Sequence, residues 1–183
     1  AKDYATVITD ADAIAGTGVL PNGDIQLLKA RAIIDSTATV GGTRQITDAL
    51  ALLNSVTVSE SQRGVWQEYR ARAYFALGEY DSAAESITAA LREGISGARY
   101  YLRGQIEEAR ADDLLAAIRS YEWVTAWDAV YGYAYAQDAA QRAEQLSTRV
   151  AVTATVAALT ATAAAETPQG TPDGTASTAT PTP

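Results

Sequence analysis

The sequence predicts an all-α fold in which antiparallel helix hairpins stack into a right-handed superhelical solenoid. Apolar residues recur with the helical period through most of the chain. Glycines stand where two of these amphipathic segments should end. The same small and apolar residues also return with a period of about 34 residues, and repeat periods of roughly 20–50 residues are typical of stacked supersecondary units.

Composition divides the 183 residues near residue 148. All aromatic residues lie before residue 136, whereas residues 148–183 hold four of the five prolines. Because a packed core needs bulky side chains, we expect residues 1–150 to fold and residues 151–183 to form a low-complexity Thr/Ala/Pro-rich tail. We expect the last helix to continue into this tail and to end near residue 160, since Ala favours a helix and Thr disfavours it.

The first expected element is a single helix within residues 1–16. Its apolar face consists of Tyr4, Val7, Ala11 and Ile14. Gly16 is the stop signal. This spacing matches the second helix of the later hairpins, so we interpret the segment as an N-terminal half-repeat or capping helix, which a solenoid end needs.

Three hairpins are predicted over residues 24–127. The clearest is ARAYFALGEYDSAAESITAA, where Gly78 ends one helix and Gly94 ends the next. The first hairpin carries about seven extra residues, from Asp35 to Gly42, between its helices, and the third has one extra residue in its turn.

The second helices of the three hairpins share their spacing. Three small residues recur at one constant interval, and three apolar residues follow four positions later: Ala49, Ala83 and Ala117, then Leu53, Ile87 and Tyr121. A small residue at the same place in each hairpin allows two helices to approach closely.

An aromatic turn and a C-terminal capping helix are predicted over residues 128–150. Tyr131, Tyr133 and Tyr135 alternate there, so an extended segment would point all three the same way. Two interpretations remain open: the tyrosines pack on the last helix, or they form an exposed contact patch, since aromatic side chains carry much interface energy.

The period and the small-residue pattern resemble the tetratricopeptide repeat (TPR) family. The sequence departs from the family pattern at Gln67 and Glu107, where aromatics are usual, and at Ile95, where a closing proline is usual. The resemblance implies that first helices line a concave groove for partner peptides. The positions that match this groove are Glu68, Arg72, Phe75, Tyr101, Gln105 and Glu108. No Lys or Asn stands among them, so a clamp for a terminal carboxylate is not expected; a merely solvated concave face is the alternative.

Composition excludes much chemistry. Without His or Cys the chain has no soft-metal site, thiol nucleophile or Ser-His-Asp triad. A net charge of −8 disfavours nucleic acid, and no apolar run is long enough to span a bilayer. We interpret the acidic pairs Glu107–Glu108 and Asp112–Asp113 as solvated charged turns, and we expect no enzyme activity, cofactor or metal.

The tail resembles those of secreted or cell-surface bacterial proteins. The chain begins at Ala1 and contains no Met, so we expect a removed signal segment and an extracellular location. Ser/Thr-rich segments with Pro are typical of O-glycosylated stalks, and a plain flexible linker is the alternative. The O-glycosylation candidates are Thr160, Thr162, Thr167, Thr171, Thr175, Ser177, Thr178, Thr180 and Thr182.

These expectations together favour a non-catalytic scaffold that acts by protein–protein interaction. An unpaired helix at one end and an extra helical segment at the other could join copies head to tail into a fibre or array. The alternative is a monomeric adaptor that binds a partner peptide in the concave groove.

Overall fold

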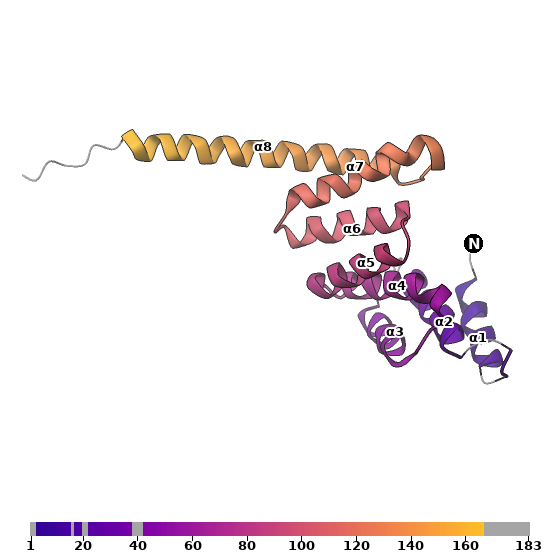
Figure 1. The fold of residues 1–183 in the computed structure, drawn as a ribbon. Coiled ribbons are helices and arrows are strands. Elements are labelled where there is room, and N and C mark those ends of the chain that lie inside the picture. The colour runs from indigo at the N-terminus through magenta and orange to yellow at the C-terminus, as the bar shows by residue number, and fades with distance from the viewer. Residues whose placement is uncertain (1–2, 16, 20–21, 38–41, 167–183) are drawn as a thin grey trace, which may run out of the picture. The chain divides into compact units, whose positions relative to one another are not determined.

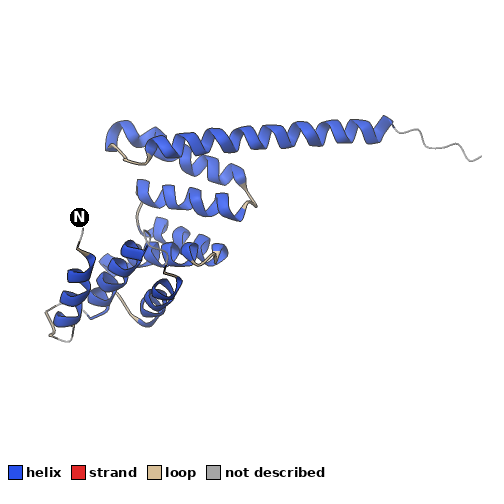
Figure 2. Cartoon of the chain, turned by 180° about the vertical axis from the view of Figure 1, so that it is seen from behind, coloured by secondary structure: helices blue, strands red, loops and turns tan. Residues whose placement is uncertain are grey.

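The computed structural model describes residues 3–15, 17–19, 22–37 and 42–166. Within these residues the backbone forms eight α-helices and one short 3-10 helix, and no strand (Figure 2). The all-α prediction is therefore confirmed. The chain divides into two compact units, residues 1–147 and 148–183, and each is described by itself.

The first unit contains the helices α1 to α7 and the beginning of α8 (Figure 1). The helices are α1 (Tyr4–Ile14), α2 (Asn22–Thr37), α3 (Thr43–Ser55), α4 (Arg63–Ala76), α5 (Tyr80–Glu93), α6 (Gly97–Arg110), α7 (Leu114–Tyr131) and α8 (Ala136–Glu166), with the 3-10 helix Glu60–Gln62 before α4. Each helix from α1 to α7 packs against its neighbours in the chain, and α4 also touches α2 and α6.

The residues that recur at a constant interval are the core of the second helices. All six of them have no accessible surface: Ala49, Ala83, Ala117, Leu53, Ile87 and Tyr121. The position three residues before these alanines is not uniform, because Ile46 is buried before Ala49 whereas Tyr80 is exposed before Ala83. Burial at a constant interval shows that α3, α5 and α7 use the same face.

The first helices α4 and α6 also bury equivalent positions. The buried pairs are Gly64 and Gly97, Tyr69 and Leu102, Ala71 and Gly104, and Ala73 and Ile106, and the two members of each pair are separated by the same interval. Gly104 is required by close packing, since a Cβ atom there would lie 2.6 Å from the ring of Tyr121. The small residue on α6 thus makes room for the large one on α7.

Two helices of the first unit are longer than predicted. The predicted first-hairpin insertion begins at Asp35, but α2 continues to Thr37, and the hydroxyls of Ser36 and Thr37 donate to the carbonyl of Ile33. These bonds satisfy the polar side chains inside the helix, so they do not break it. Likewise α7 continues past residue 127 to Tyr131 and ends only at Gly132, whose φ of +64° is left-handed.

The second unit is described as far as Glu166 and is helical there. The helix therefore runs beyond the predicted end near residue 160. Three threonine hydroxyls donate to the carbonyl four residues earlier, which keeps this Thr-rich stretch internally hydrogen-bonded: Thr153, Thr155 and Thr160. The rest of the predicted tail lies outside the described residues. In the part of the chain that the structure covers, no helix combines the length and the apolarity needed to cross a bilayer.

Candidate protein-binding surfaces

A groove of about 440 Å³ lies between α2, α4 and α6, beside the start of α3. Its lining includes Ile34, Asp35, Ile46, Arg72, Phe75, Leu102 and Gln105. Three of the six residues predicted from the family resemblance, Arg72, Phe75 and Gln105, therefore share one hollow. Its walls are mainly apolar, with one carboxylate and one guanidinium group.

Tyr69 organises the charged side of this groove. Its hydroxyl donates to Asp35 at 2.9 Å, and the guanidinium groups of Arg31 and Arg72 lie 5.1 and 5.3 Å from its ring centre. Burial, followed by the charge of Asp35, raises the pKa of Tyr69 above its ordinary value. The phenol therefore stays protonated and holds Asp35 in place.

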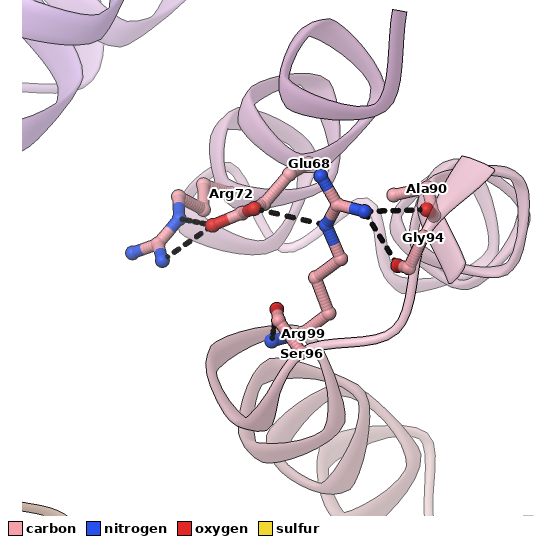
Figure 3. A network of polar contacts seen from close by, with 6 residues as sticks. All are labelled: Glu68, Arg72, Ala90, Gly94, Ser96 and Arg99. Carbon is pink, nitrogen blue, oxygen red and sulfur yellow. Dashed lines mark hydrogen bonds and ion pairs between the residues drawn. The ribbon is translucent and has the colours of Figure 1, made fainter. Parts of the chain in front are cut away.

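A nearly buried ion-pair network joins α4 to α6 (Figure 3). Glu68 accepts hydrogen bonds from Arg72 at 2.8 and 3.2 Å and from Arg99 at 3.1 Å. Arg99 also donates to the carbonyls of Ala90 and Gly94 at 2.9 and 2.5 Å, at the carboxyl end of α5. Both oxygens of Glu68 are thus engaged within the chain, and Arg99 caps a helix end that carries partial negative charge.

A second network holds the start of α8 against α6 and α7. The hydroxyl of Tyr121 donates to Glu108 at 2.8 Å, and Arg142 donates to Glu108 at 3.0 Å and to Asp138 at 2.7 Å. Tyr101 also donates to Asp138. Hydrogen bonds from Tyr101 and then Arg142 lower the pKa of Asp138, whereas burial and then Glu108 raise the pKa of Tyr121. The structure thus ties Tyr101 and Glu108 to partners inside the chain.

Eight aromatic rings form a continuous row, which we call the aromatic row. In order of contact it runs Tyr100, Trp123, Trp127, Tyr131, Tyr133, Tyr135, Tyr101 and Tyr121. Tyr100 and Trp123 stack with their centres 4.2 Å apart, and Tyr133 and Tyr135 stack at 5.4 Å with planes 12° apart. The three alternating tyrosines of the sequence therefore share one stack, although Tyr131 is the last residue of a helix rather than part of an extended segment.

Part of this row lines a second hollow of about 600 Å³, which we call the aromatic hollow. Its lining is Ile95, Ser96, Gly97, Ala98, Trp123, Trp127, Tyr131, Tyr133 and Tyr135. A Cβ atom at Gly97 would lie 2.4 Å from the Tyr133 ring, so that ring rests directly on the backbone of α6. Asp128 accepts the backbone N–H of Tyr133 at 2.7 Å and fixes the turn.

The two tryptophans of the hollow were not assigned to a site from the sequence. The spacing of four from Trp123 through Trp127 to Tyr131 was the available signal, because residues four apart share a helix face. What the spacing could not show is that the following turn folds Tyr133 and Tyr135 back onto the same face.

The interpretation of the acidic pairs as solvated turns is wrong for Glu107 and Glu108, whose side chains lie in the last turn of α6 and are 13% and 27% exposed. It agrees with Asp112 and Asp113, whose side chains are mainly exposed. Glu107 and Asp112 both contact Arg110, at 3.3 and 3.4 Å. Asp113 accepts the backbone N–H of Ala116 at 3.0 Å and caps α7. Among the described residues, no three His, Cys, Asp or Glu side chains are grouped so that they could hold a metal ion.

Of the O-glycosylation candidates, only Thr160 has a described side chain. It is exposed, and its hydroxyl donates to the carbonyl of Val156 at 2.9 Å. Thr162 lies on α8. The remaining candidates lie outside the described residues: Thr167, Thr171, Thr175, Ser177, Thr178, Thr180 and Thr182.

Neither a family model nor a curated protein nor a solved structure matches the chain. What the chain binds is therefore inferred from its own surfaces. These are the groove of the first unit, the aromatic hollow and the exposed side of the helix in the second unit.

Proposed function

We propose that this chain is a non-catalytic scaffold with a TPR-like, right-handed solenoid fold, and that it assembles with other copies of itself into an extracellular fibre or array. The observation that carries the proposal is an apolar stripe on the second unit. Val152, Val156 and Leu159 are exposed by 57%, 56% and 66%. Spaced by four and then three residues, they lie on one side of the helix.

An exposed row of large apolar side chains marks a protein-contact surface better than single exposed residues do. The other exposed positions of this helix are mostly Ala and Thr, which offer little binding energy of their own. A partner copy that covers the stripe would remove its apolar surface from water. If the stripe meets a different surface on the next copy, the contact is heterologous and generates an open polymer unless the ring closes.

The test is the oligomeric state of the full chain. Light scattering after size-exclusion chromatography should give masses well above 19.2 kDa that rise with concentration. The double variant Val152→Glu/Val156→Glu should remain at monomer mass, because it places two carboxylates on the stripe. Glu favours a helix at least as well as Val, so far-UV circular dichroism should stay unchanged.

The matched control is Ala154→Glu/Ala157→Glu, which adds the same charge on the opposite side of the helix. It should assemble like the wild type. A wild-type chain that stays monodisperse at monomer mass at all concentrations contradicts the proposal, as does a stripe variant that assembles as well as the control.

The groove between α2, α4 and α6 favours the second candidate function, a monomeric adaptor for a partner peptide. Phe75 and Leu102 supply apolar contacts, and Arg72 supplies a cation held by Glu68. Peptides selected from a displayed random library against the full chain should lose binding to Phe75→Glu and keep binding to the stripe variant. Selected peptides that are indifferent to Phe75→Glu would contradict this function.

A further inference from the structure

We propose that the aromatic hollow binds a proline-rich segment in the polyproline II conformation, and that its occupant is the Thr/Pro-rich end, residues 167–183, of a second copy. The inference rests on the self-association proposed above and names a segment that takes part in it.

The chemistry of the lining is the first argument. Two tryptophans and three tyrosines supply five rings, and Trp127 and Tyr131 are exposed by 43% and 61%. Proline-rich segments dock in grooves lined by such aromatic side chains, because the polyproline II helix is preformed and loses little entropy on binding.

The hydrogen-bond donors of the hollow also favour a polyproline II segment. Among the residues that the structure describes, no protein acceptor pairs with the indole N–H groups of Trp123 and Trp127 or with the hydroxyls of Tyr131, Tyr133 and Tyr135. A polyproline II segment has no internal hydrogen bonds, so its carbonyls are free to accept from these donors. The hollow thus offers apolar faces together with donors, and the segment offers proline rings together with acceptors.

The lack of charge in the hollow also favours a segment with few charged residues. None of the nine lining residues is charged, although a fifth of the chain is. Residues 167–183 carry a single charged side chain, Asp173. An uncharged hollow would leave the charges of a strongly acidic or basic peptide without partners, whereas this segment brings only one charged side chain.

The sequence of the segment supplies the required backbone. Four prolines each follow a threonine, at Thr167-Pro168, Thr171-Pro172, Thr180-Pro181 and Thr182-Pro183. The ring of proline fixes its own φ in the polyproline II range and drives the preceding residue to extended backbone, so each Thr-Pro pair favours polyproline II.

The apolar stripe explains why a second copy is the source. The stripe ends at Leu159, and residues 167–183 follow within the same chain. A neighbour that covers the stripe therefore meets the Thr-Pro pairs of that chain at high effective concentration. Binding of the segment in the hollow would then strengthen the assembly even if the isolated segment binds weakly.

The experiment titrates a synthetic, unmodified peptide of residues 167–183 into the full chain that carries Val152→Glu/Val156→Glu. Calorimetry should show saturable binding, and Trp fluorescence should shift. A peptide of equal length with all four prolines replaced by alanine should bind about tenfold more weakly or worse. The added variants Trp127→Ala and Tyr131→Ala should each weaken binding about tenfold or more, whereas Tyr80→Ala, an exposed aromatic on α5, should not.

Equal binding of the alanine peptide overturns the proposal, as does undiminished binding by both hollow variants with native circular dichroism. Absence of saturable binding at millimolar peptide also overturns it. These failures are distinct from failure of the scaffold function, because the mass of the wild-type assembly is measured without the peptide. If the chain assembles and the peptide does not bind, only the occupant of the hollow is wrong.

Discussion

Gly78 and Ala111 occupy equivalent places just after the ends of α4 and α6, and both have left-handed backbone. The φ angles are +78° and +58°. Glycine adopts this region freely, whereas a residue with a Cβ atom is strained there. Consecutive hairpins thus place different residues at the same left-handed position, and of the two only glycine adopts that backbone without strain.

We expect Ala111→Gly to stabilise the protein by about 0.5–1 kcal/mol, because relief of strain exceeds the added entropy of the unfolded chain. Urea denaturation followed by circular dichroism measures this. The reciprocal change Gly78→Ala should cost about 1 kcal/mol, since no atom lies within 4 Å of the new Cβ and only strain acts. A destabilised Ala111→Gly protein would contradict the assignment of strain.

Arg99 forms an ion pair that is largely shielded from solvent. Its side chain is 11% exposed and that of Glu68 is 13% exposed, so Arg99→Ala leaves the nearly buried Glu68 with Arg72 as its remaining partner and removes the donor to the carbonyls at the end of α5. We expect Arg99→Ala to lower the free energy of unfolding by about 2 kcal/mol. The control Arg63→Ala removes a pair exposed by 50% and 35% and should change it by less than about 0.5 kcal/mol. Equal effects of the two changes would show that the network is not structural.

At the scale of the element, helices were predictable where apolar residues repeat and a glycine follows. Gly78 and Gly94 mark the ends of α4 and α5 within two residues. Helix ends inside polar stretches were not predictable, because α2 and α8 are sustained by hydroxyls that donate to carbonyls of their own helix. Periodicity carries no information about such bonds.

Tyr121 shows the same limit at the contact between α7 and α6. Its burial followed from the constant spacing of the second helices, but its hydrogen bond to Glu108 did not. The spacing of apolar residues predicts which face of a helix is buried, but it does not predict which residue a side-chain hydroxyl bonds.

We expect Tyr121→Phe to cost about 1.5 kcal/mol at neutral pH through loss of the bond to Glu108. The pKa of Tyr121 is higher in the folded state than its ordinary value of 10. The protonated phenol therefore stabilises the fold fully below pH 10, and this stabilisation is lost as the pH rises from 10 through the higher pKa of the folded state. Stability measured by urea denaturation at increasing alkaline pH should therefore fall less steeply in the variant. Identical pH profiles of the variant and the wild type would contradict a buried Tyr121 phenol.

At the scale of the molecule, the sequence supplied the all-α class and three of the groove residues that share a hollow. Three of the five rings of the aromatic hollow, Tyr131, Tyr133 and Tyr135, were predicted as a candidate contact patch. The hollow itself was not predictable, because its rings come from α7 and the turn that follows, and its backbone floor comes from α6. Packing between elements brings these parts together, and no local pattern encodes it.

We also propose that the Thr-rich tail is O-glycosylated, which raises the mass of the whole molecule. Intact mass spectrometry of the protein recovered from its source should give masses above 19.2 kDa in hexose-sized steps. The same chain made in a host without the relevant transferases is the control and should give 19.2 kDa. A source protein without added mass would contradict the glycosylated tail.

The packing of each helix from α1 to α7 against its chain neighbours has a kinetic consequence. Contacts between neighbours in sequence close only short loops, so this unit has a low contact order and should fold rapidly. Unfolding can begin at one end without exposing the other. Trp66 on α4 and Trp123 on α7 lie in different parts of the array, and together they would reveal which end opens first.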